Sequence, residues 1–430
     1  MSDFKLSALQ QQASDAVLRW FEESRKLRYN TPHPPFYLAG YAGSGKTSIA
    51  KSIVGRLFAG NTPNEPDALD DLDADLDSDP DDELANSPFR YAAYTGKASL
   101  VLARKGCSPA STIHSLIYSC TEHPVTKEIT FRRRGSLPRL LSLIIPDECS
   151  MINDEMANDL LYFNRSMLCL GDPGQLPPID GSGYFTARAP DFFLTEIHRQ
   201  AAESPILIAA TCAREGRSFP AAFANTEQTS VKTMVNQPTW ASLLEFDQVL
   251  CGTNKLRTYL NDMLRMAQGY RTPSSSNPVP AVGEKLICTR NNWNLKNMVN
   301  GSLWRVVSAE QIPPERINFY DKQTGRSTPI TIANRLRFKL TPWESPDAEP
   351  VEAISHLHFF DQTLPKPNHK AEWSGLTQFD FGYAISVHKS QGSEWDKVFL
   401  FNEAATFREN RKQWLYTGIT RAAKHLTIRL

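Results

Sequence analysis

The chain has 430 residues, of which 41% are hydrophobic and 22% are charged. This composition is typical of a globular protein, and the length predicts two to four domains. No stretch approaches the roughly 18 consecutive apolar residues of a membrane-spanning helix, so we expect no membrane segment. Seven cysteines lie without a C-x-x-C pair, which indicates neither a zinc site nor a disulfide framework. The N-terminus has no basic start followed by an apolar core, so we expect no secretion signal and a cytoplasmic location, in a bacterium or a phage-infected host.

Bases and acids balance at 47 each, but residues 65–83 (EPDALDDLDADLDSDPDDE) contain eleven acids and no base. Without them, 36 acids (47 less 11) face 47 bases, and such a surplus suits a phosphate backbone. We predict an acidic, flexible insertion over residues 62–86, because self-repulsion opposes folding there. Leu69, Leu72 and Leu76 follow helical spacing, so a helix that forms on a basic partner protein is the alternative. A third hypothesis is that the insertion covers the basic surface when no polyanion is bound there.

In chain order, apolar segments that end in polar loops read as strands at about residues 36–40, 89–93, 140–145 and 166–171. Helical patterns follow the first two, and this alternation predicts a parallel α/β sheet with functional loops at the carboxyl ends of its strands. Residues 118–138 break the alternation and predict an inserted hairpin. Residues 282–375 are strand-like and rich in turns, and predict an inserted β-rich domain.

The segment GYAGSGKT, residues 40–47, matches the phosphate-binding pattern G-x-x-x-x-G-K-[ST] in full. It follows an apolar strand and opens a helical pattern, which is the context that this motif requires. Glycines let backbone N–H groups surround a phosphate, Lys46 adds a positive charge, and Thr47 offers a hydroxyl to Mg²⁺. The sequence therefore predicts a site for ATP and Mg²⁺ that includes Gly43, Ser44, Gly45, Lys46 and Thr47.

Two further strand ends carry polar side chains that suit such a site. In LIIPDECSM (residues 143–151), Asp147 is expected to hold Mg²⁺ and Glu148 to orient or deprotonate the attacking water. In GDPGQLPPI (residues 171–179), Asp172 and Gln175 are placed to sense the γ-phosphate. Pro146 lacks an N–H group, so we expect regular strand pairing to stop one residue before it.

Two arginines lie far along the chain from the P-loop, Arg199 in LTEIHRQ and Arg421 in YTGITRA. A second α/β unit that faces the first would bring either one to the γ-phosphate, where it would stabilise the charge of the transition state. The catalytic residues that we predict are Lys46, Asp147, Glu148, Gln175, Arg199 and Arg421.

These motifs, in this order and over almost the whole chain, resemble the RecD/Dda-type branch of the superfamily 1 helicases. The likeness extends to LSALQQQA, AAYTGKAS, STIHSLIY and AISVHKSQGSEWDKV, which begin at residues 6, 92, 111 and 384. It implies two RecA-like parallel-sheet P-loop domains with ATP between them, an inserted β-hairpin and an inserted small β-barrel-containing domain. The implied activity is that of an ATP-dependent DNA helicase, a monomer that moves 5′ to 3′ on single-stranded DNA and separates forked duplex DNA.

The resemblance implies domain boundaries and further site residues. The first domain would be residues 1–182 with the hairpin at 118–138, the second 183–281 with 376–430, and the inserted domain 282–375. Gln10 would read the adenine, and the other nucleotide contacts would be Gly392 and Glu394. The expected DNA contacts are Thr95, Lys97, His114, Thr253, Asn254, His388 and Lys389.

Aromatic and basic residues extend the expected DNA surface. Tyr118, Phe131 and Trp293 are candidates for base stacking, with core packing as the alternative for each. Arg132 to Arg134, in the expected hairpin, would meet the duplex at the fork or form a solvated basic turn.

Two other functions remain open for the same motifs. One is a translocase or recombination subunit that hydrolyses ATP on single strands and separates duplex only with partners. The other is a non-enzymatic, nucleotide-gated binding module, against which the full set of predicted catalytic residues argues.

Overall fold

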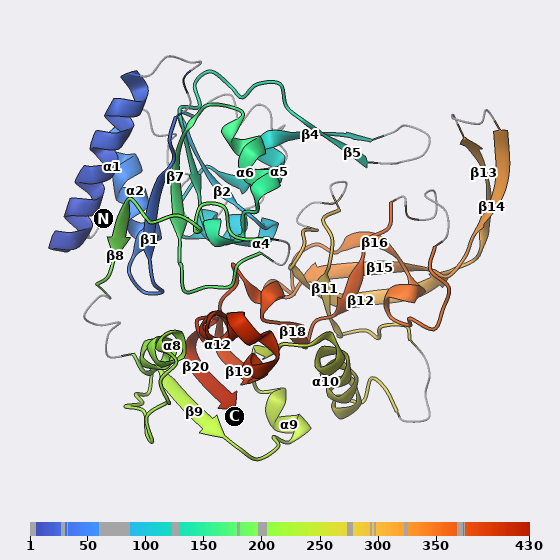
Figure 1. The fold of residues 1–430 in the computed structure, drawn as a ribbon. Coiled ribbons are helices and arrows are strands. Elements are labelled where there is room, and N and C mark those ends of the chain that lie inside the picture. Colours follow the sequence, from blue (N-terminus) through green and yellow to red (C-terminus); the bar gives the residue numbers. More distant parts are fainter. Residues whose placement is uncertain are drawn as a thin grey trace. The chain divides into compact units, whose positions relative to one another are not determined.

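A computed structural model describes residues 6–26, 31, 33–59, 87–122, 129–178, 181–196, 204–272, 278–292, 295, 298–321, 326–367, 373 and 375–430. The chain divides into two compact units (Figure 1). The first comprises Met1–Ser119, Arg133–Val235 and Ser390–Leu430, and the second comprises Cys120–Arg132 and Asn236–Lys389. The acidic insertion predicted at 62–86 lies outside the described residues.

The first unit contains most of the helices and the parallel strands. Its helices are α1 (Ala8–Lys26), α2 (Lys46–Leu57), α4 (Gly96–Arg104), α5 (Ile113–Ile117), η1 (Cys149–Met151), α6 (Asp154–Leu161), α8 (Pro205–Glu215), η4 (Ala404–Asn410) and α12 (Arg411–Ile419). Its strands are β1 (Phe36–Gly40), β2 (Phe89–Ala93), β3 (Ala110–Thr112), β6 (Leu143–Pro146), β7 (Ser166–Gly171), β8 (Phe192–Leu194), β9 (Ser230–Met234), β19 (Trp395–Phe401) and β20 (Ala422–Arg429).

A six-stranded sheet in the order β3-β2-β6-β7-β1-β8 forms the centre of this unit, and every neighbouring pair is parallel. Strand β1 is buried along its whole length, as expected for a strand covered on both faces. Phe36 and Leu38 belong to one hydrophobic core with residues of α1 and α2, whereas Tyr37 and Ala39 belong to another with residues of α5 and α6. These helices can be followed beside the sheet in Figure 1. The sheet is thus the middle layer of three, and the predicted α/β class with a parallel sheet is confirmed.

Strands β9, β20 and β19 pair in parallel in the same unit. The second unit holds another parallel pair, β10 (Gln248–Cys251) with β18 (Ala384–Ser386). Both sets come from the segments predicted for the second α/β domain. The boundaries of that domain stay a prediction.

The remainder of the second unit is rich in strands. It contains β11 (Lys285–Cys288), β12 (Leu303–Ile312), β13 (Glu315–Asp321), β14 (Arg326–Ile332), β15 (Arg335–Pro342), β16 (Val351–His356) and β17 (Phe379–Phe381). Its helices are α9 (Trp240–Leu243), α10 (Asn254–Ala267), η2 (Leu357–Phe359) and η3 (His388–Ser390). The last residue of η3, Ser390, already belongs to the first unit.

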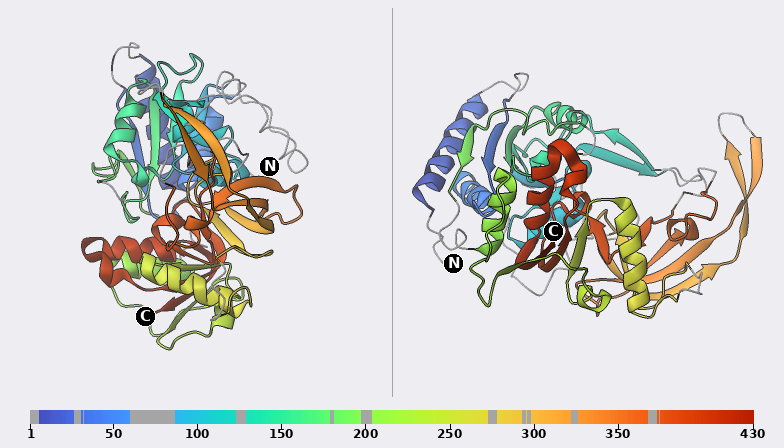
Figure 2. Two further views of the ribbon diagram at one scale, coloured as in Figure 1. Left: turned by 90° about the vertical axis from the view of Figure 1, so that its right-hand side faces the viewer. Right: turned by 60° about the horizontal axis from the view of Figure 1, so that its bottom comes forward.

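Five of these strands form a sheet in the order β16-β15-β12-β11-β17, and β13 pairs with β14 as a two-stranded ribbon that projects beyond that sheet (Figure 2). Neighbouring strands that are paired within this sheet run antiparallel. The described strands have an open order, so closure into the expected barrel stays a prediction.

A two-stranded sheet of β4 (Tyr118–Glu122) and β5 (Ile129–Arg133) lies in the segment where the hairpin was expected. Its role at a DNA fork stays a prediction. Within the described residues, no helix combines the length and the apolar composition that crossing a bilayer requires.

Candidate nucleotide site and nucleic-acid contacts

The P-loop lies between β1 and α2, at the carboxyl edge of the six-stranded sheet. Gly43 and Gly45 have φ values of 79° and 81°, a left-handed conformation that favours glycine. At Gly40, an added Cβ would lie 2.4 Å from Oγ of Ser44, so a larger residue there would displace the Ser44 hydroxyl. The Nζ of Lys46 donates to the carbonyl oxygens of Gly40 at 2.6 Å and Tyr41 at 3.2 Å. The segment therefore adopts a tight, glycine-dependent turn, and phosphate binding there stays a prediction.

Gln10 is anchored directly to this turn. Its side chain is buried, its Nε2 donates to the carbonyl oxygen of Ser44 at 3.2 Å, and its Oε1 accepts from the backbone N–H of Ser7. The hydroxyl oxygen of Ser44 is buried and has no hydrogen-bond partner among the described residues. A polar atom of this kind suits a bound anion, so the residues present fit a nucleotide phosphate.

The acid pair follows β6, two strands from β1 in the same sheet. Glu148 has a φ of 52°, and its backbone N–H donates to Oδ1 of Asp147 at 3.0 Å. Burial and the neighbouring carboxylate of Glu148 raise the pKa of Asp147 from its ordinary value of 3.8 to about 6. Lys46 acts in the opposite direction and lowers that pKa. Two adjacent carboxylates whose charge is partly compensated by one lysine suit a divalent cation.

Strand pairing at Pro146 differs from the expectation. On the β2 side, pairing continues through Ala92 opposite Pro146, and the N–H of Asp147 donates to the carbonyl oxygen of Ala92 at 2.9 Å. On the β7 side, the paired residues end at Ile144 opposite Met167. The backbone N–H groups of successive residues in a strand point to opposite sides. The N–H of Asp147 points to β2, so the N–H that Pro146 lacks would have pointed to β7, where strand pairing has already ended. The prediction that pairing stops before Pro146 was wrong for one of its two neighbours.

The loop after β7, residues 172–176 (the β7 loop), reaches the acid pair. Gln175 is buried, and its Nε2 donates to Oε1 of Glu148 at 3.4 Å. Its Oε1 has no hydrogen-bond partner among the described residues. Asp172 is fully buried, and burial raises its pKa. The structure thus brings together the predicted catalytic residues Glu148 and Gln175.

The C-terminal segment of the first unit packs on the same loops. The hydroxyl of Tyr416 donates to Oδ2 of Asp172 at 2.6 Å and accepts from the N–H of Ala42 at 2.8 Å. Oγ1 of Thr417 accepts from the N–H of Leu176 at 2.9 Å. The sequence prediction missed these two residues, although they are the first two of the quoted motif YTGITRA that contains Arg421.

The two predicted arginines have different outcomes. Arg199 lies outside the described residues. Arg421 is buried, and its guanidinium donates to the carbonyl oxygens of Thr417 and Ser393 and to the hydroxyl of Thr420. These bonds hold it within its own segment, so its role at the γ-phosphate stays a prediction.

Gly392 and Glu394 lie beside α4. A Cβ added to Gly392 would be 2.9 Å from that of Ala98, and Glu394 forms an exposed ion pair with Lys105 at 3.5 Å. Their expected contact with the nucleotide stays a prediction. The described part of the site therefore consists of the P-loop, the acid pair and the β7 loop.

The expected DNA contacts of the first unit gather around α4 and α5. Thr95 caps the N-terminus of α4, where its Oγ1 accepts from the N–H of Ala98. The ammonium of Lys97 lies 4.6 Å from the ring centroid of Trp395. His114 packs against the rings of Tyr94 and Tyr118, and burial lowers its pKa. A neutral imidazole at neutral pH can still donate a hydrogen bond to a phosphate.

The aromatic and basic candidates differ in exposure. The hydroxyl of Tyr118 donates to Asp159 at 2.5 Å, and Arg133 pairs with the same carboxylate while lying over the ring of Tyr162. These contacts favour a structural role for both residues. Phe131 is 46% exposed in β5 and remains a candidate for stacking. Trp293 lies outside the described residues.

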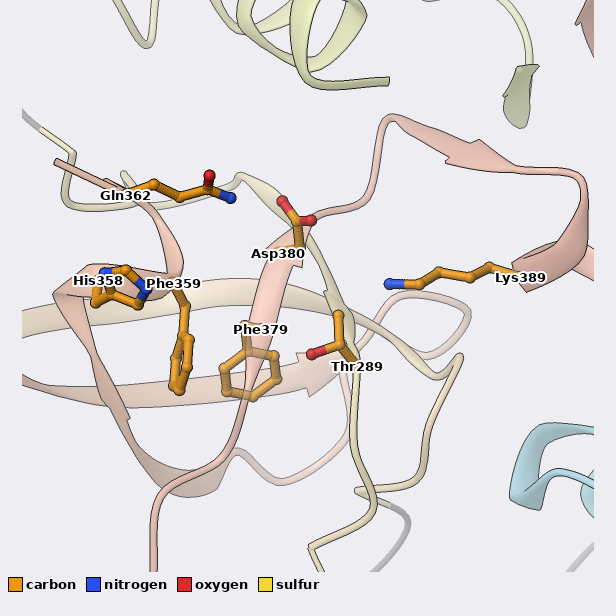
Figure 3. Close-up of a pocket in the computed structure, with 7 residues that line it drawn as sticks. All are labelled: Thr289, His358, Phe359, Gln362, Phe379, Asp380 and Lys389. Atoms are coloured by element: carbon orange, nitrogen blue, oxygen red, sulfur yellow. The ribbon is translucent and has the colours of Figure 1, made fainter. Parts of the chain in front are cut away.

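The second unit presents its expected contacts at the start of α10 and at η3. Oγ1 of Thr253 accepts from the N–H of Leu256 and caps α10, whose first residue is Asn254. Burial lowers the pKa of both His388 and Lys389. Lys389 lines a cavity of about 200 Å³, toward which Asp380 and Thr289 also point (Figure 3). This cavity is polar at one side and bounded by Phe359 and Phe379 at the other.

Among the described residues, no cluster of three or more histidine, cysteine or acidic side chains could hold a metal by itself. Mg²⁺ is typically bound through one or two protein ligands together with substrate phosphates. Thr47 and Asp147, beside a phosphate-binding turn, fit that kind of metal site.

Comparisons with known proteins agree with these motifs. Residues 31–235 match the model of an AAA domain, and residues 381–428 match that of a UvrD-like helicase C-terminal domain. The ATP-dependent RecD2 DNA helicase of Deinococcus radiodurans is 25% identical over 420 residues, which cover 93% of this chain and 47% of that protein. The chain therefore spans about half the length of this curated relative.

The chain is also similar to a viral protein and to two solved structures. The uncharacterized protein R530 of Acanthamoeba polyphaga mimivirus is 32% identical over 179 residues, 36% of this chain and 31% of that protein. Crystal structures of Pif1 helicase from Candida albicans and of Bacteroides Pif1 bound to single-stranded DNA are 15% and 17% identical, with TM-scores of 0.48 and 0.47. Both matches cover 99% of this chain. They cover 94% of the Candida albicans chain and 92% of the Bacteroides chain.

Proposed function

We propose that this chain, which is similar to a RecD2 DNA helicase and matches a UvrD-like helicase C-terminal domain, is an ATP-driven motor of the superfamily 1 helicase type that moves 5′ to 3′ on single-stranded DNA and separates duplex. The observation that carries the proposal is the hydrogen bond from Gln175 to Glu148 beside a complete P-loop. This arrangement brings the carboxylate of Glu148 and the amide of Gln175 together at the edge of the sheet that also carries the P-loop, which supports roles for both residues in activating water.

Each residue of the site has a proposed role in ATP hydrolysis. The P-loop amides and Lys46 hold the β- and γ-phosphates, and Thr47 and Asp147 hold Mg²⁺. When bound, the metal neutralises charge on the phosphates. Glu148 orients the attacking water and accepts its proton, while Gln175 fixes the carboxylate of Glu148. Gln10 reads the adenine, and Gly392 and Glu394 complete the nucleotide contacts.

Arg421 and Arg199 would stabilise the transition-state charge. For Arg421, this role requires its guanidinium to leave the carbonyl oxygens that it now contacts. Exchange of those neutral acceptors for a phosphate is favourable, because hydrogen bonds between charged partners are roughly twice as strong as neutral ones.

DNA binding is proposed on two surfaces, one in each unit. In the first, Thr95 and Lys97 lie at the N-terminus of α4, where backbone N–H groups favour phosphate; His114 joins them. In the second, His388 and Lys389 lie at η3, and Thr253 and Asn254 begin α10. Polar and basic contacts of this kind position a strand without reading its sequence. A basic protein that binds the acidic insertion is a further proposed partner.

The test is DNA-stimulated ATP hydrolysis by the Lys46→Ala variant. Loss of the phosphate-binding charge should reduce turnover by at least about a hundredfold, because such electrostatic contacts contribute several kcal/mol to transition-state binding. Lys51→Ala, which removes an exposed lysine from the same helix, is the matched control and should retain normal turnover. Near-normal hydrolysis by Lys46→Ala contradicts the proposal, and turnover at background in the wild-type chain favours the non-enzymatic binding module.

A further inference from the structure

The hydroxyl of Tyr416 connects the two loops that border the nucleotide site. It accepts from the N–H of Ala42 in the P-loop at 2.8 Å and donates to Asp172 in the β7 loop at 2.6 Å. Its ring is 1% exposed and packs against Gly174, where an added Cβ would lie 3.1 Å from the ring Cε1. One atom of α12 thus fixes the distance between the P-loop and the β7 loop.

The same segment holds the far end of the β7 loop. The N–H of Leu176 donates to Thr417, and its carbonyl oxygen accepts from Nε2 of Gln391 at 3.0 Å. Asp172 and Leu176 are therefore both bound by residues of the C-terminal segment. Gln175, which donates to Glu148, lies between these two fixed points. The position of its amide consequently depends on the contacts that α12 makes.

The chemistry of the hydroxyl suits a permanent connection. Burial and the adjacent carboxylate of Asp172 raise the pKa of Tyr416 well above its usual value, so the phenol keeps its proton and continues to donate. The other oxygen of Asp172 accepts from the N–H of Gly174 at 2.8 Å. A hydrogen bond to a carboxylate is stronger than one between neutral groups, and its loss would leave buried groups unpaired.

We propose that Tyr416 is a positioning residue for ATP hydrolysis, which holds the P-loop and Gln175 in register with the helix that leads to Arg421. It does not touch the reacting atoms; it acts through Asp172 and the β7 loop on Gln175 and Glu148. The inference rests on the proposed ATPase function and adds a residue to its machinery.

The test is Tyr416→Phe, which removes only the hydroxyl. We expect kcat for DNA-stimulated ATP hydrolysis to fall by about tenfold or more, since small misplacements of positioned groups can cost up to about a hundredfold. The KM for ATP should change less than about threefold, because Lys46 and the P-loop amides remain. Tyr37→Phe is the matched control, since the buried hydroxyl of Tyr37 has no hydrogen-bond partner among the described residues; its kcat should match the wild-type value.

A double-mutant cycle separates positioning from general damage. If Tyr416 acts through Gln175, adding Tyr416→Phe to Gln175→Ala should reduce kcat by much less than it does in the wild-type background. Thr417→Val removes the neighbouring bond to Leu176 and provides a second variant should Tyr416→Phe fold poorly. It should show the same selective loss of kcat and the same dependence on Gln175.

The outcomes are distinct. A fall in kcat with a nearly constant KM, absent in the Gln175→Ala background, supports the proposal. An unchanged kcat in a folded Tyr416→Phe variant overturns it. The proposal also fails if the fold reduction of kcat in the double mutant equals the product of the reductions in the two single mutants. A wild-type chain without ATP turnover overturns the proposed function first, and this inference with it.

Discussion

Asp147 and Glu148 combine a proposed role in catalysis with a cost in stability. The carboxyl group of Asp147 lies at the end of a buried strand, and its pKa is raised to about 6. Its charged form is therefore disfavoured in the folded protein when no cation is bound. Glu148 adds a left-handed backbone conformation, which costs energy for a residue other than glycine. Both features are typical of residues retained for binding or catalysis.

Replacement of Asp147 by asparagine should stabilise the protein without Mg²⁺ and nucleotide. The folded pKa is raised, so above about pH 6 the wild-type folded state carries a charge that the unfolded state accommodates more easily. We expect Asp147→Asn to increase the free energy of unfolding at pH 8 by about 1–2 kcal/mol, allowing for partial solvent access. The gain should shrink at pH 5, where the folded wild-type protein has largely protonated Asp147. Denaturant unfolding at both pH values measures the difference.

Asp159 provides a control of opposite sign. Hydrogen bonds from Tyr118 and Arg133 lower its pKa, although desolvation acts against them. Its stabilising contribution is present above the ordinary carboxyl pKa and is lost as the pH falls through the lowered value. Asp159→Asn should therefore reduce stability at pH 8. A loss of stability in Asp147→Asn at pH 8 would contradict the interpretation of the acid pair.

At the scale of elements, the sequence predicted those features that depend on local chemistry. The P-loop could be predicted because its left-handed backbone conformation requires glycine at fixed positions along one short segment. The pairing around Pro146 could not be predicted, since the outcome depends on which neighbouring strand faces the missing N–H. Tyr416 escaped prediction because its role arises from two loops more than two hundred residues away. Spacing along one chain carries no information about such a contact.

The second unit contains a buried ion pair that connects α10 to the residue immediately before β11. Nε and Nη2 of Arg265 donate to the two carboxylate oxygens of Glu284 at 2.6 and 3.0 Å, and both side chains are buried. Glu284→Ala would leave the guanidinium buried and unpaired, so we expect a loss of about 3–5 kcal/mol in the free energy of unfolding of this unit. Denaturant unfolding followed by tryptophan fluorescence measures it.

The exposed pair of Glu310 and Arg337 is the matched control, with side chains 61% and 49% exposed. Glu310→Ala should cost less than about 1 kcal/mol, as is usual for surface pairs. Equal losses in Glu284→Ala and Glu310→Ala would show that the buried pair has no special role in joining α10 to the sheet.

At the scale of the whole molecule, neutral net charge conceals an uneven distribution. The eleven acids of residues 65–83 offset an equal basic surplus in the rest of the chain. A surplus of this size favours phosphate binding with a marked dependence on salt. The acidic insertion would therefore reduce the affinity for DNA if it competes for the same surface.

Deletion of residues 62–86 should tighten binding to single-stranded DNA at low salt, with a difference that fades as ionic strength rises. An equal-length variant with the eleven acids changed to asparagine or glutamine separates charge from length and should behave like the deletion. Binding measured by fluorescence anisotropy across a salt series tests this. Affinity that stays the same at every salt concentration rules out competition with DNA.

The most direct test of the proposed function is ATP-dependent unwinding of duplexes with a single-stranded overhang at either the 5′ or the 3′ end. A motor that moves 5′ to 3′ should separate the 5′-overhang substrate, leave the 3′-overhang substrate intact and lose this activity in Lys46→Ala. Hydrolysis of ATP on single strands without any unwinding would instead indicate a translocase that needs partners. Separation of the 3′-overhang substrate alone, or unwinding that does not require ATP, would contradict the proposed motor.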